Sequence, residues 1–468
     1  METLQRAANA GSVSTGFDID NSVKLEADND ERFTRTPSSA GNRKTWTFSA
    51  WVKRTELGAN QILISAADTY LYIGSDDAIW CNFRPATENF FLATNRVFRD
   101  TAAWYHIVVQ CDTTQGTASN RAKLWVNGVQ ETSLQNSTYD NMSVNLDTSM
   151  NNTIEHMIGR YSGSDDYRMS GYISEFYLVD GTALEPTDFG EFDADSGIWK
   201  PKAYAGSYGT NGFYLNFDNS GSLGADSSGN GHTWTLNNLT SADQATDTPT
   251  NNFATFNPLI RYFSTTINEG ATKVTNSDTA NWRSYVSSIA VQSGKWYAEF
   301  QAGGTSFIGV GNMAELTGTL PYTQYLGQIA ASIGYYSVGI LFYNGASQSG
   351  SFAGFGTSDK ISVALDKDNG FVYFAKNGVW QNSGDPTSGA TGTGGVALTS
   401  GNTGYSSSDY YVIGYAPNSA TSGFANYGGY TTMSISSAAS DADGYGTFEY
   451  APPTGYYALC TKNLAEYG

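Results

Sequence analysis

The sequence has little cysteine, histidine or charge, and each shortage excludes a class of protein. Its 3 cysteines lie far apart, so no disulfide framework is expected and packing must hold the fold together. Its 3 histidines have no spacing typical of a zinc site. Neither a GxSxG nucleophile elbow nor a GxxxxGK phosphate loop is present. The common hydrolase and nucleotide-binding chemistries are therefore not indicated.

Positive charge is also scarce, with 25 Lys and Arg against 44 Asp and Glu and a net charge of -19. Proteins that bind nucleic acids usually concentrate basic residues on one face, so we expect no nucleic-acid partner. No run of 18 apolar residues occurs, and the first residues contain no apolar signal segment. We therefore expect neither membrane insertion nor Sec export.

Aromatic and turn-forming residues are abundant instead. Aromatics make up 14% of the 468 residues, and 51 residues are glycine. This composition favours short strands joined by many turns, and the length suits two sandwich domains. The predicted fold class is all-β, with two tandem antiparallel β-sandwich (jelly-roll) domains.

Alternating apolar residues predict strands in both halves of the chain. In residues 45–54, Trp46, Phe48, Ala50 and Val52 alternate with more polar residues. In residues 295–300, Trp296, Ala298 and Phe300 do the same. Asn-Gly pairs at 127–128 and 377–378 predict hairpin turns, and the Gly/Ser/Thr-rich residues 382–409 predict a long exposed loop.

These patterns divide the chain into three parts. Residues 1–20 are expected to form an N-terminal arm, residues 21–260 a first sandwich, and residues 261–468 a second. Prolines punctuate residues 185–260, which also contain strand patterns. We assign that zone to the first sandwich as an appended part.

The first half resembles the concanavalin A-like, laminin G type family. The resemblance is carried by TWTFSAWVKR at 45–54, WYHIVVQCD at 104–112, KLWVNGV at 123–129 and GYISEFYLVDGTAL at 171–184. A further family-like segment, FYLNFDNSGSLGADSSGNGHTW at 213–234, follows the others instead of preceding them. It implies either a circularly permuted strand that returns to the first sheet or a partial second copy.

The second half resembles a SPRY domain, through GKWYAEF at 294–300, FIGVG at 307–311 and DKISVALDKDNGFVYFAKNGVW at 359–380. The combination also resembles tail-fibre-like and structural proteins of marine phages, through DTPTNNFATFNPL at 247–259 and GYYALCTKNL at 455–464. This resemblance implies a bacteriophage virion protein on the particle exterior, as a tail fibre, adhesin or capsid decoration protein. It also implies that the arm at residues 1–20 attaches the protein to the particle and becomes ordered on binding.

The implied function is recognition of a host surface glycan or protein, without enzymatic activity. The implied partners are other virion proteins and copies of the chain itself, since phage fibres are commonly trimeric. Two alternatives stay open. The protein could be a purely structural cementing protein of the capsid or tail, or a glycan depolymerase on a glucanase-like sandwich.

Carbohydrate-binding candidates combine an aromatic ring with neighbouring acids in a turn, because rings stack on sugar C–H faces and polar groups fix the hydroxyls. The candidates are Asp76, Asp77, Trp80, Asp165, Asp166, Tyr167 and Tyr405. No cofactor is required. The resemblance to laminin G domains makes calcium a candidate ion, with Asp76, Asp77 and Asp226 as ligands, and the pair Asp165 and Asp166 as further turn acids.

A retaining glucanase would need two carboxylates about 5 Å apart with one pKa raised. The nearest candidates are Glu191, Asp193 and Asp195 in the EFDAD segment. They lie among glycine and serine outside the predicted strands, which indicates an exposed acidic turn. We therefore expect no catalytic site there.

Overall fold

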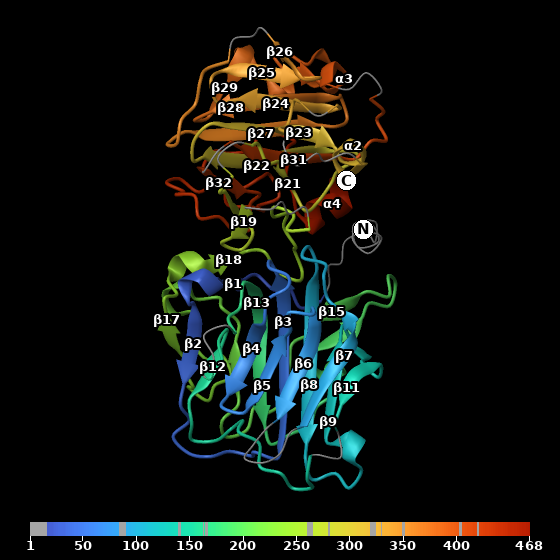
Figure 1. The fold of residues 1–468 in the computed structure, drawn as a ribbon, viewed down its shortest axis with the longest axis vertical. Helices are drawn as coiled ribbons and strands as arrows, with labels where there is room; N and C mark the ends of the chain where they lie inside the picture. The colour runs from blue at the N-terminus through green and yellow to red at the C-terminus, as the bar shows by residue number, and fades with distance from the viewer. Residues whose placement is uncertain are drawn as a thin grey trace. The chain divides into compact units, whose positions relative to one another are not determined.

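The computed structural model describes residues 16–83, 90–138, 142–161, 163, 167–259, 265–278, 281–318, 324–328, 330–348, 352–401, 405–418 and 421–468. The chain divides into an N-terminal unit, Val13–Thr250, and a C-terminal unit, Asn251–Gly468 (Figure 1). This boundary precedes the predicted one at residue 260, because Ala254 and Phe256 pack into the C-terminal core. Both units are built from sheets of mainly antiparallel strands, so the all-β fold class is confirmed.

The first sheet of the N-terminal unit has the strand order β10-β9-β8-β3-β13-β1-β18, with β16 also paired to β13. Its strands are β1 (Ser22–Leu25), β3 (Thr45–Arg54), β8 (Trp104–Asp112), β9 (Ala122–Val126), β10 (Val129–Gln130), β13 (Gly171–Asp180), β16 (Phe213–Leu215) and β18 (Gln244–Ala245). The predicted strand at 45–54 is β3. Its Trp46, Phe48, Ala50 and Val52 all face the core, as expected.

The second sheet packs across that core and has the order β11-β7-β6-β5-β4-β12-β2-β17. Its strands are β2 (Arg32–Arg35), β4 (Gln61–Ala66), β5 (Thr69–Ile73), β6 (Ala78–Phe83), β7 (Phe90–Val97), β11 (Leu134–Ser137), β12 (His156–Ile158) and β17 (Thr235–Asn237). A separate hairpin joins β14 (Gly190–Phe192) to β15 (Trp199–Pro201). Residues 185–250 thus contribute five strands to this unit.

Strand β13 carries two partners end to end on one edge. Its residues 171–173 pair with β1, and its residues 176–178 pair with β16. Its register against β3 shifts between Ser174 and Tyr177, where Glu175 has a φ of 49°. The displaced family-like segment therefore returns to the first sheet, which is the permuted arrangement and not a second copy.

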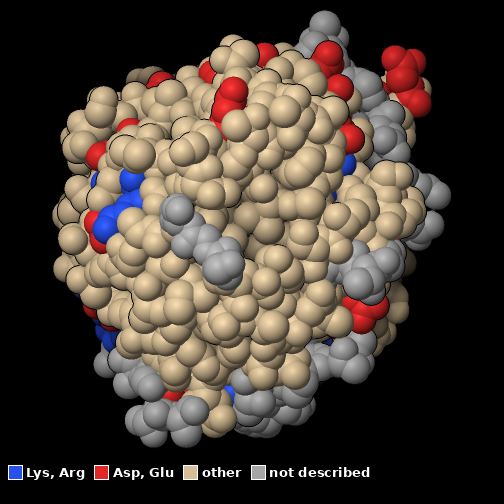
Figure 2. Space-filling model, turned by 90° about the horizontal axis from the view of Figure 1, so that it is seen from above, with Lys and Arg blue, Asp and Glu red and all other residues tan. Residues whose placement is uncertain are grey.

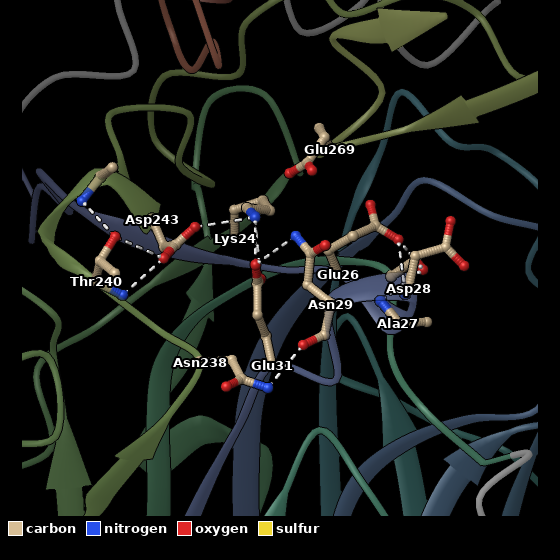
Figure 3. Close-up of polar contacts among 12 residues, drawn as sticks. Lys24, Glu26, Ala27, Asp28, Asn29, Glu31, Asn238, Thr240, Asp243 and Glu269 are labelled. Atoms are coloured by element: carbon tan, nitrogen blue, oxygen red, sulfur yellow. Dashed lines mark hydrogen bonds and ion pairs between the residues drawn. The ribbon is translucent and has the colours of Figure 1, made fainter. Parts of the chain in front are cut away.

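Buried ion pairs link strands from the first part of the N-terminal unit to residues near its C-terminal end. Figure 3 shows Lys24 of β1 between two carboxylates, with its Nζ 2.8 Å from Glu31 Oε1 and 2.9 Å from Asp243 Oδ1. Burial raises the pKa of Glu31 even though Lys24 opposes that shift. A second buried pair joins Lys53 Nζ to Asp247 Oδ2 at 2.6 Å. Removing either lysine would leave buried negative charge without compensation.

The C-terminal unit is a second pair of sheets. The first contains β19 (Thr265–Asn268), β20 (Lys273–Asn276), β22 (Lys295–Ala302), β27 (Lys360–Asp366), β28 (Phe371–Lys376), β29 (Val379–Trp380), β30 (Val396–Ala397), β32 (Thr421–Asn426) and β33 (Tyr457–Ala458). The second contains β21 (Tyr285–Val286), β23 (Ser306–Asn312), β24 (Ser332–Tyr336), β25 (Ile340–Tyr343), β26 (Ala346–Gln348) and β31 (Tyr411–Pro417). Trp296, Ala298 and Phe300 of β22 face the core, as their alternation predicts.

The α-helices of the described residues are short: α2 (Met313–Gly318), α3 (Leu398–Gly401) and α4 (Thr461–Tyr467). In the part of the chain that the structure describes, no helix is long and apolar enough to span a membrane. Figure 2 views the end of the C-terminal unit where β25 and β26 lie in Figure 1, and uncharged residues cover most of that face.

The prediction of one long exposed loop at 382–409 is wrong. The segment contains short 3-10 turns, β30 paired with β28, and α3. Pro386, Val396 and Leu398 are buried, so a few apolar side chains among many small polar ones anchor the segment to the unit. The two Asn-Gly turns form as predicted, with φ values of 50° and 76° at Asn127 and Gly128.

Candidate functional site

The outer face of the second sheet in the N-terminal unit is aromatic. Side chains alternate along each strand, so Leu71 and Ile73 of β5 fill the core while Tyr70 and Tyr72 point outward. Trp80 of β6 lies directly across from Tyr72 on the same face. We call this set the aromatic face, and its members are Ile62, Tyr70, Tyr72, Trp80, Phe91, Tyr161 and Tyr167.

The rings of the aromatic face contact one another across strands and loops. The Tyr72 ring lies 6.1 Å from the Trp80 ring, nearly parallel to it, and 5.6 Å from the Tyr167 ring, edge-on. The Tyr161 ring lies 4.4 Å from Tyr70. Trp80, Tyr161 and Tyr167 stay partly exposed. Two sequence candidates, Trp80 and Tyr167, are thus brought together by Tyr72, which the sequence analysis did not single out.

Asp76 fixes the edge of this face. Its carboxylate accepts hydrogen bonds from Trp80 Nε1 at 3.1 Å, from Gln135 Nε2 at 2.9 Å and from the Ala78 amide at 3.1 Å. Partial burial raises the pKa of Asp76, but these hydrogen bonds outweigh that effect and lower it below the ordinary value. The indole is therefore held in one orientation beside an ionised, exposed carboxylate and an exposed amide.

Asp77 is buried and does not join the aromatic face. Its carboxylate lies 3.0 Å from Arg54 Nη1 and 2.7 Å from Arg99 Nε, and it accepts a hydrogen bond from the Gly58 amide. Burial alone would raise the pKa of Asp77. The hydrogen bond from Arg99 and the contacts with its other partners lower this pKa by more, so it lies below the ordinary value. The structure therefore uses this candidate in an internal ion-pair network.

Asp226 closes a turn. Its Oδ1 accepts hydrogen bonds from the amides of Tyr214 and Ser228, and its Oδ2 accepts one from the amide of His232. Asp165 and Asp166 lie outside the described residues. Within the described ranges, no three His, Cys, Asp or Glu side chains gather as metal ligands would. The three named calcium candidates are spread over separate hydrogen-bond networks and do not converge.

The EFDAD acids lie at the β14–β15 hairpin. Asp193 accepts hydrogen bonds from the Ser196 amide at 2.9 Å and from Lys200 Nζ at 3.2 Å, and these contacts lower its pKa to about 2. Glu191 lies 3.4 Å from the same lysine, and half of its side chain is exposed. Asp195 donates its amide to Asp193. An acid with a pKa near 2 is ionised at neutral pH and cannot act as the proton donor of a glycosidase.

Tyr405 belongs to the C-terminal unit and packs against a buried lysine. Lys367 Nζ lies 4.7 Å from the centre of the Tyr405 ring and 4.5 Å from that of Tyr411, a cation–π arrangement. Burial lowers the pKa of Lys367 to about 8. One function of the Tyr405 ring is therefore to accommodate this cation.

Two buried titratable residues were missed from the sequence. Glu175 of β13 is only 3% exposed and accepts hydrogen bonds from the hydroxyls of Tyr177 and Tyr214, and burial raises its pKa to about 7. His106 lies between the rings of Trp51 and Trp199, and burial lowers its pKa to about 3. The sequence does contain a signal for Glu175, since it is a single glutamate inside the largely apolar run GYISEFYLVD. Trp51, on the outer face of β3, is accommodated there by stacking on His106, which in turn stacks on Trp199.

Comparisons with known proteins agree with this architecture. Residues 28–188, which include the whole aromatic face, match the family described as the Concanavalin A-like lectin/glucanases superfamily, so the expected concanavalin A-like region is confirmed there. No curated protein matches the chain.

Among solved structures, the chain is similar to the SPRY domain of human HERC1, at 15% identity over 36% of this chain and 96% of that one, with a TM-score of 0.27. It is also similar to the TRIM65 PSpry domain, at 15% identity over 37% and 88%, with a TM-score of 0.28. A third similar structure is a protein described as carbohydrate-binding from Bacteroides ovatus, at 15% identity over 48% and 60%, with a TM-score of 0.35.

Proposed function

We propose that the protein binds glycans through the aromatic face and acts as an adhesin without cleaving its ligand. The observation that carries the proposal is the cross-strand cluster of partly exposed rings beside Asp76 and Gln135. A region matched by a lectin and glucanase family supports the same reading. Rings of this kind stack on the C–H face of a sugar, and the carboxylate and amide bind its hydroxyls.

Binding is favoured over hydrolysis by the state of the acids. Asp76, the acid that contacts Trp80, has a lowered pKa, and Asp193 has a pKa of about 2. Glu175 has the raised pKa that a proton donor needs. It is buried, however, beneath tyrosines on the outer face of the first sheet, whereas the aromatic face belongs to the second sheet. A retaining glycosidase needs a raised and an ionised carboxyl together, facing the substrate.

The setting we propose is the exterior of a bacteriophage virion, as a tail fibre, adhesin or capsid decoration. The support is the sequence resemblance of residues 247–259 and 455–464 to marine phage structural proteins. Its partners would then be other virion proteins, a host surface glycan and further copies of the chain. A map of intact particles that shows no density for this chain would refute this setting.

The Trp80→Ala variant tests glycan binding. We expect it to lose binding to host polysaccharide by about tenfold or more, because a central aromatic contact carries much of the binding energy. Binding is measured by adsorption of purified protein to host cells and by a glycan array. Phe192→Ala is the matched control, since this ring is 52% exposed on the β14–β15 hairpin of the same unit.

Equal binding by the Trp80→Ala variant and the unmodified protein would refute the role of the aromatic face. Gln135→Ala removes an exposed side chain at its edge, so it keeps the test valid if the tryptophan variant does not fold. Reducing ends released from the same polysaccharide by highly purified protein would favour the depolymerase alternative. Absence of any glycan or cell binding would favour the cementing alternative.

A further inference from the structure

A polar pocket opens at the edge of the N-terminal unit, and none of the residues that line it belongs to the aromatic face. Its volume is about 440 Å³, which is within the range of small-ligand sites. It lies where β9 and β10 of the first sheet approach β11 of the second. Ser119, Asn120, Gln130 and Thr132 line it with hydroxyl and amide groups. Such a lining suits a ligand rich in hydroxyls.

The first wall of the pocket is fixed from behind by Arg121. This arginine is 7% exposed, and its guanidinium donates hydrogen bonds to the carbonyls of Gln115 and Gly116, and to that of Met142. These bonds hold the turn that carries Ser119 and Asn120. The wall is therefore formed before any ligand arrives, which reduces the entropy cost of binding.

The opposite wall is fixed by contacts to β7. Glu131 forms an ion pair with Arg96 of β7 at 2.9 Å. Asn95 Nδ2 donates to Ser133 Oγ at 2.9 Å. The carboxylate of Glu131, the one acid among the residues that line the pocket, is thus already neutralised.

Lys123 supplies the pocket with a positive charge. It forms no ion pair with any other residue that the structure describes, and it is half-buried in the pocket lining. The net charge of -19 does not cancel this local effect, because charges are screened beyond about 8 Å at physiological ionic strength. The pocket therefore favours a ligand with a negative group among its hydroxyls.

Strand β11 connects the pocket to the aromatic face. Leu134 lines the pocket, and the next residue, Gln135, donates its hydrogen bond to Asp76 beside Trp80. Side chains alternate along a strand, so a chain-like ligand could cross this edge strand and reach both places.

We propose that this pocket is a second subsite that binds a carboxylate-bearing sugar, a uronic acid, through Lys123. The proposal rests on the glycan-binding function proposed above and names its substrate class, an acidic polysaccharide. Neutral parts of the chain stack on the aromatic face, and the carboxylate accepts hydrogen bonds from the Lys123 ammonium. Hydroxyls of the same sugar bind Asn120, Gln130 and Thr132.

The test uses trigalacturonate and its methyl ester, titrated by calorimetry into the full-length protein. The ester has the same sugar chain but carries an uncharged methyl ester in place of each carboxylate. We expect the acid to bind more tightly than the ester. Lys123→Gln should weaken binding of the acid about tenfold and leave the ester unchanged, because a hydrogen bond between two charged groups is stronger than one between neutral groups. Lys202→Gln, at an exposed lysine of the same unit, is the control and should change neither.

A second readout is independent of the aromatic face. Galacturonate should slow acetylation of Lys123, followed by mass spectrometry, and leave acetylation of Lys202 unchanged. Equal affinity for acid and ester, no effect of Lys123→Gln, or no protection of Lys123 would overturn the subsite. Dependence on Lys123 with no effect of Trp80→Ala would instead keep the subsite and refute the aromatic face.

Discussion

Replacing Glu175 with glutamine should stabilise the N-terminal unit at pH 8 and leave its stability at pH 4 nearly unchanged. Glutamine is neutral and similar in size, and it can still bond to the hydroxyls of Tyr177 and Tyr214. In the unmodified protein, the buried carboxyl has a pKa of about 7 against an ordinary value of 4.5. That difference corresponds to about 3 kcal/mol.

The sign follows from proton binding. The folded state holds this proton more tightly than the unfolded chain does, so its stabilising effect is complete below pH 4.5 and is lost as pH rises through 7. The glutamine variant lacks this loss. For a unit of this size, about 3 kcal/mol corresponds to a midpoint roughly 6–12 °C higher at pH 8.

The assay is calorimetric unfolding of the full-length protein and the variant at several values between pH 4 and pH 8. Glu191→Gln removes a half-exposed carboxylate from the same unit and is the matched control, which should not give the pH-dependent gain. A variant that is no more stable than the unmodified protein at pH 8 would refute the assignment of a buried, protonated Glu175. An equal gain at pH 4 and pH 8 would refute it as well.

Two further predictions concern a turn and an ion. Gly128→Ala should lower the free energy of unfolding, measured with denaturant, by about 3 kcal/mol, because φ is 76° and the new Cβ would lie 2.3 Å from the Trp199 ring. Gly229→Ala, with φ at 87° and open space around it, should lower it by only about 1 kcal/mol. Equal losses in the two variants would contradict the packing argument. Exchanging calcium for EDTA should move the midpoint of thermal unfolding by no more than about 1 °C, because the Asp77 and Asp226 carboxylates already bind protein groups. A larger rise of this midpoint in calcium would establish an ion site.

Local patterns predicted the strands well, because alternation records which side chains face a core. Trp46, Phe48, Ala50 and Val52 met that expectation, and Asn127-Gly128 formed its turn. The same reasoning failed at residues 382–409, where a few apolar anchors determine the structure of a mostly polar segment. The average composition of the segment does not show which of its few apolar residues are buried.

The candidate site could be predicted only in part. Trp80 and Tyr167 were chosen for their local surroundings, whereas Tyr72, which joins them, lies in an apolar strand and gave no such signal. Asp77 was chosen on the same grounds and proved to be an internal partner of Arg54. Whether an acid faces a ligand or an arginine depends on pairing between distant segments, which one sequence does not display.

The position of β1 has a consequence for synthesis of the chain. This strand lies between β13 and β18, so the first sheet cannot be completed until residues 244–245 have left the ribosome. Contacts that link such distant residues slow folding, since a long loop must close before they form. Until β18 emerges, the edge of β1 should therefore stay unpaired, and a chaperone that shields that edge would raise the yield of native protein.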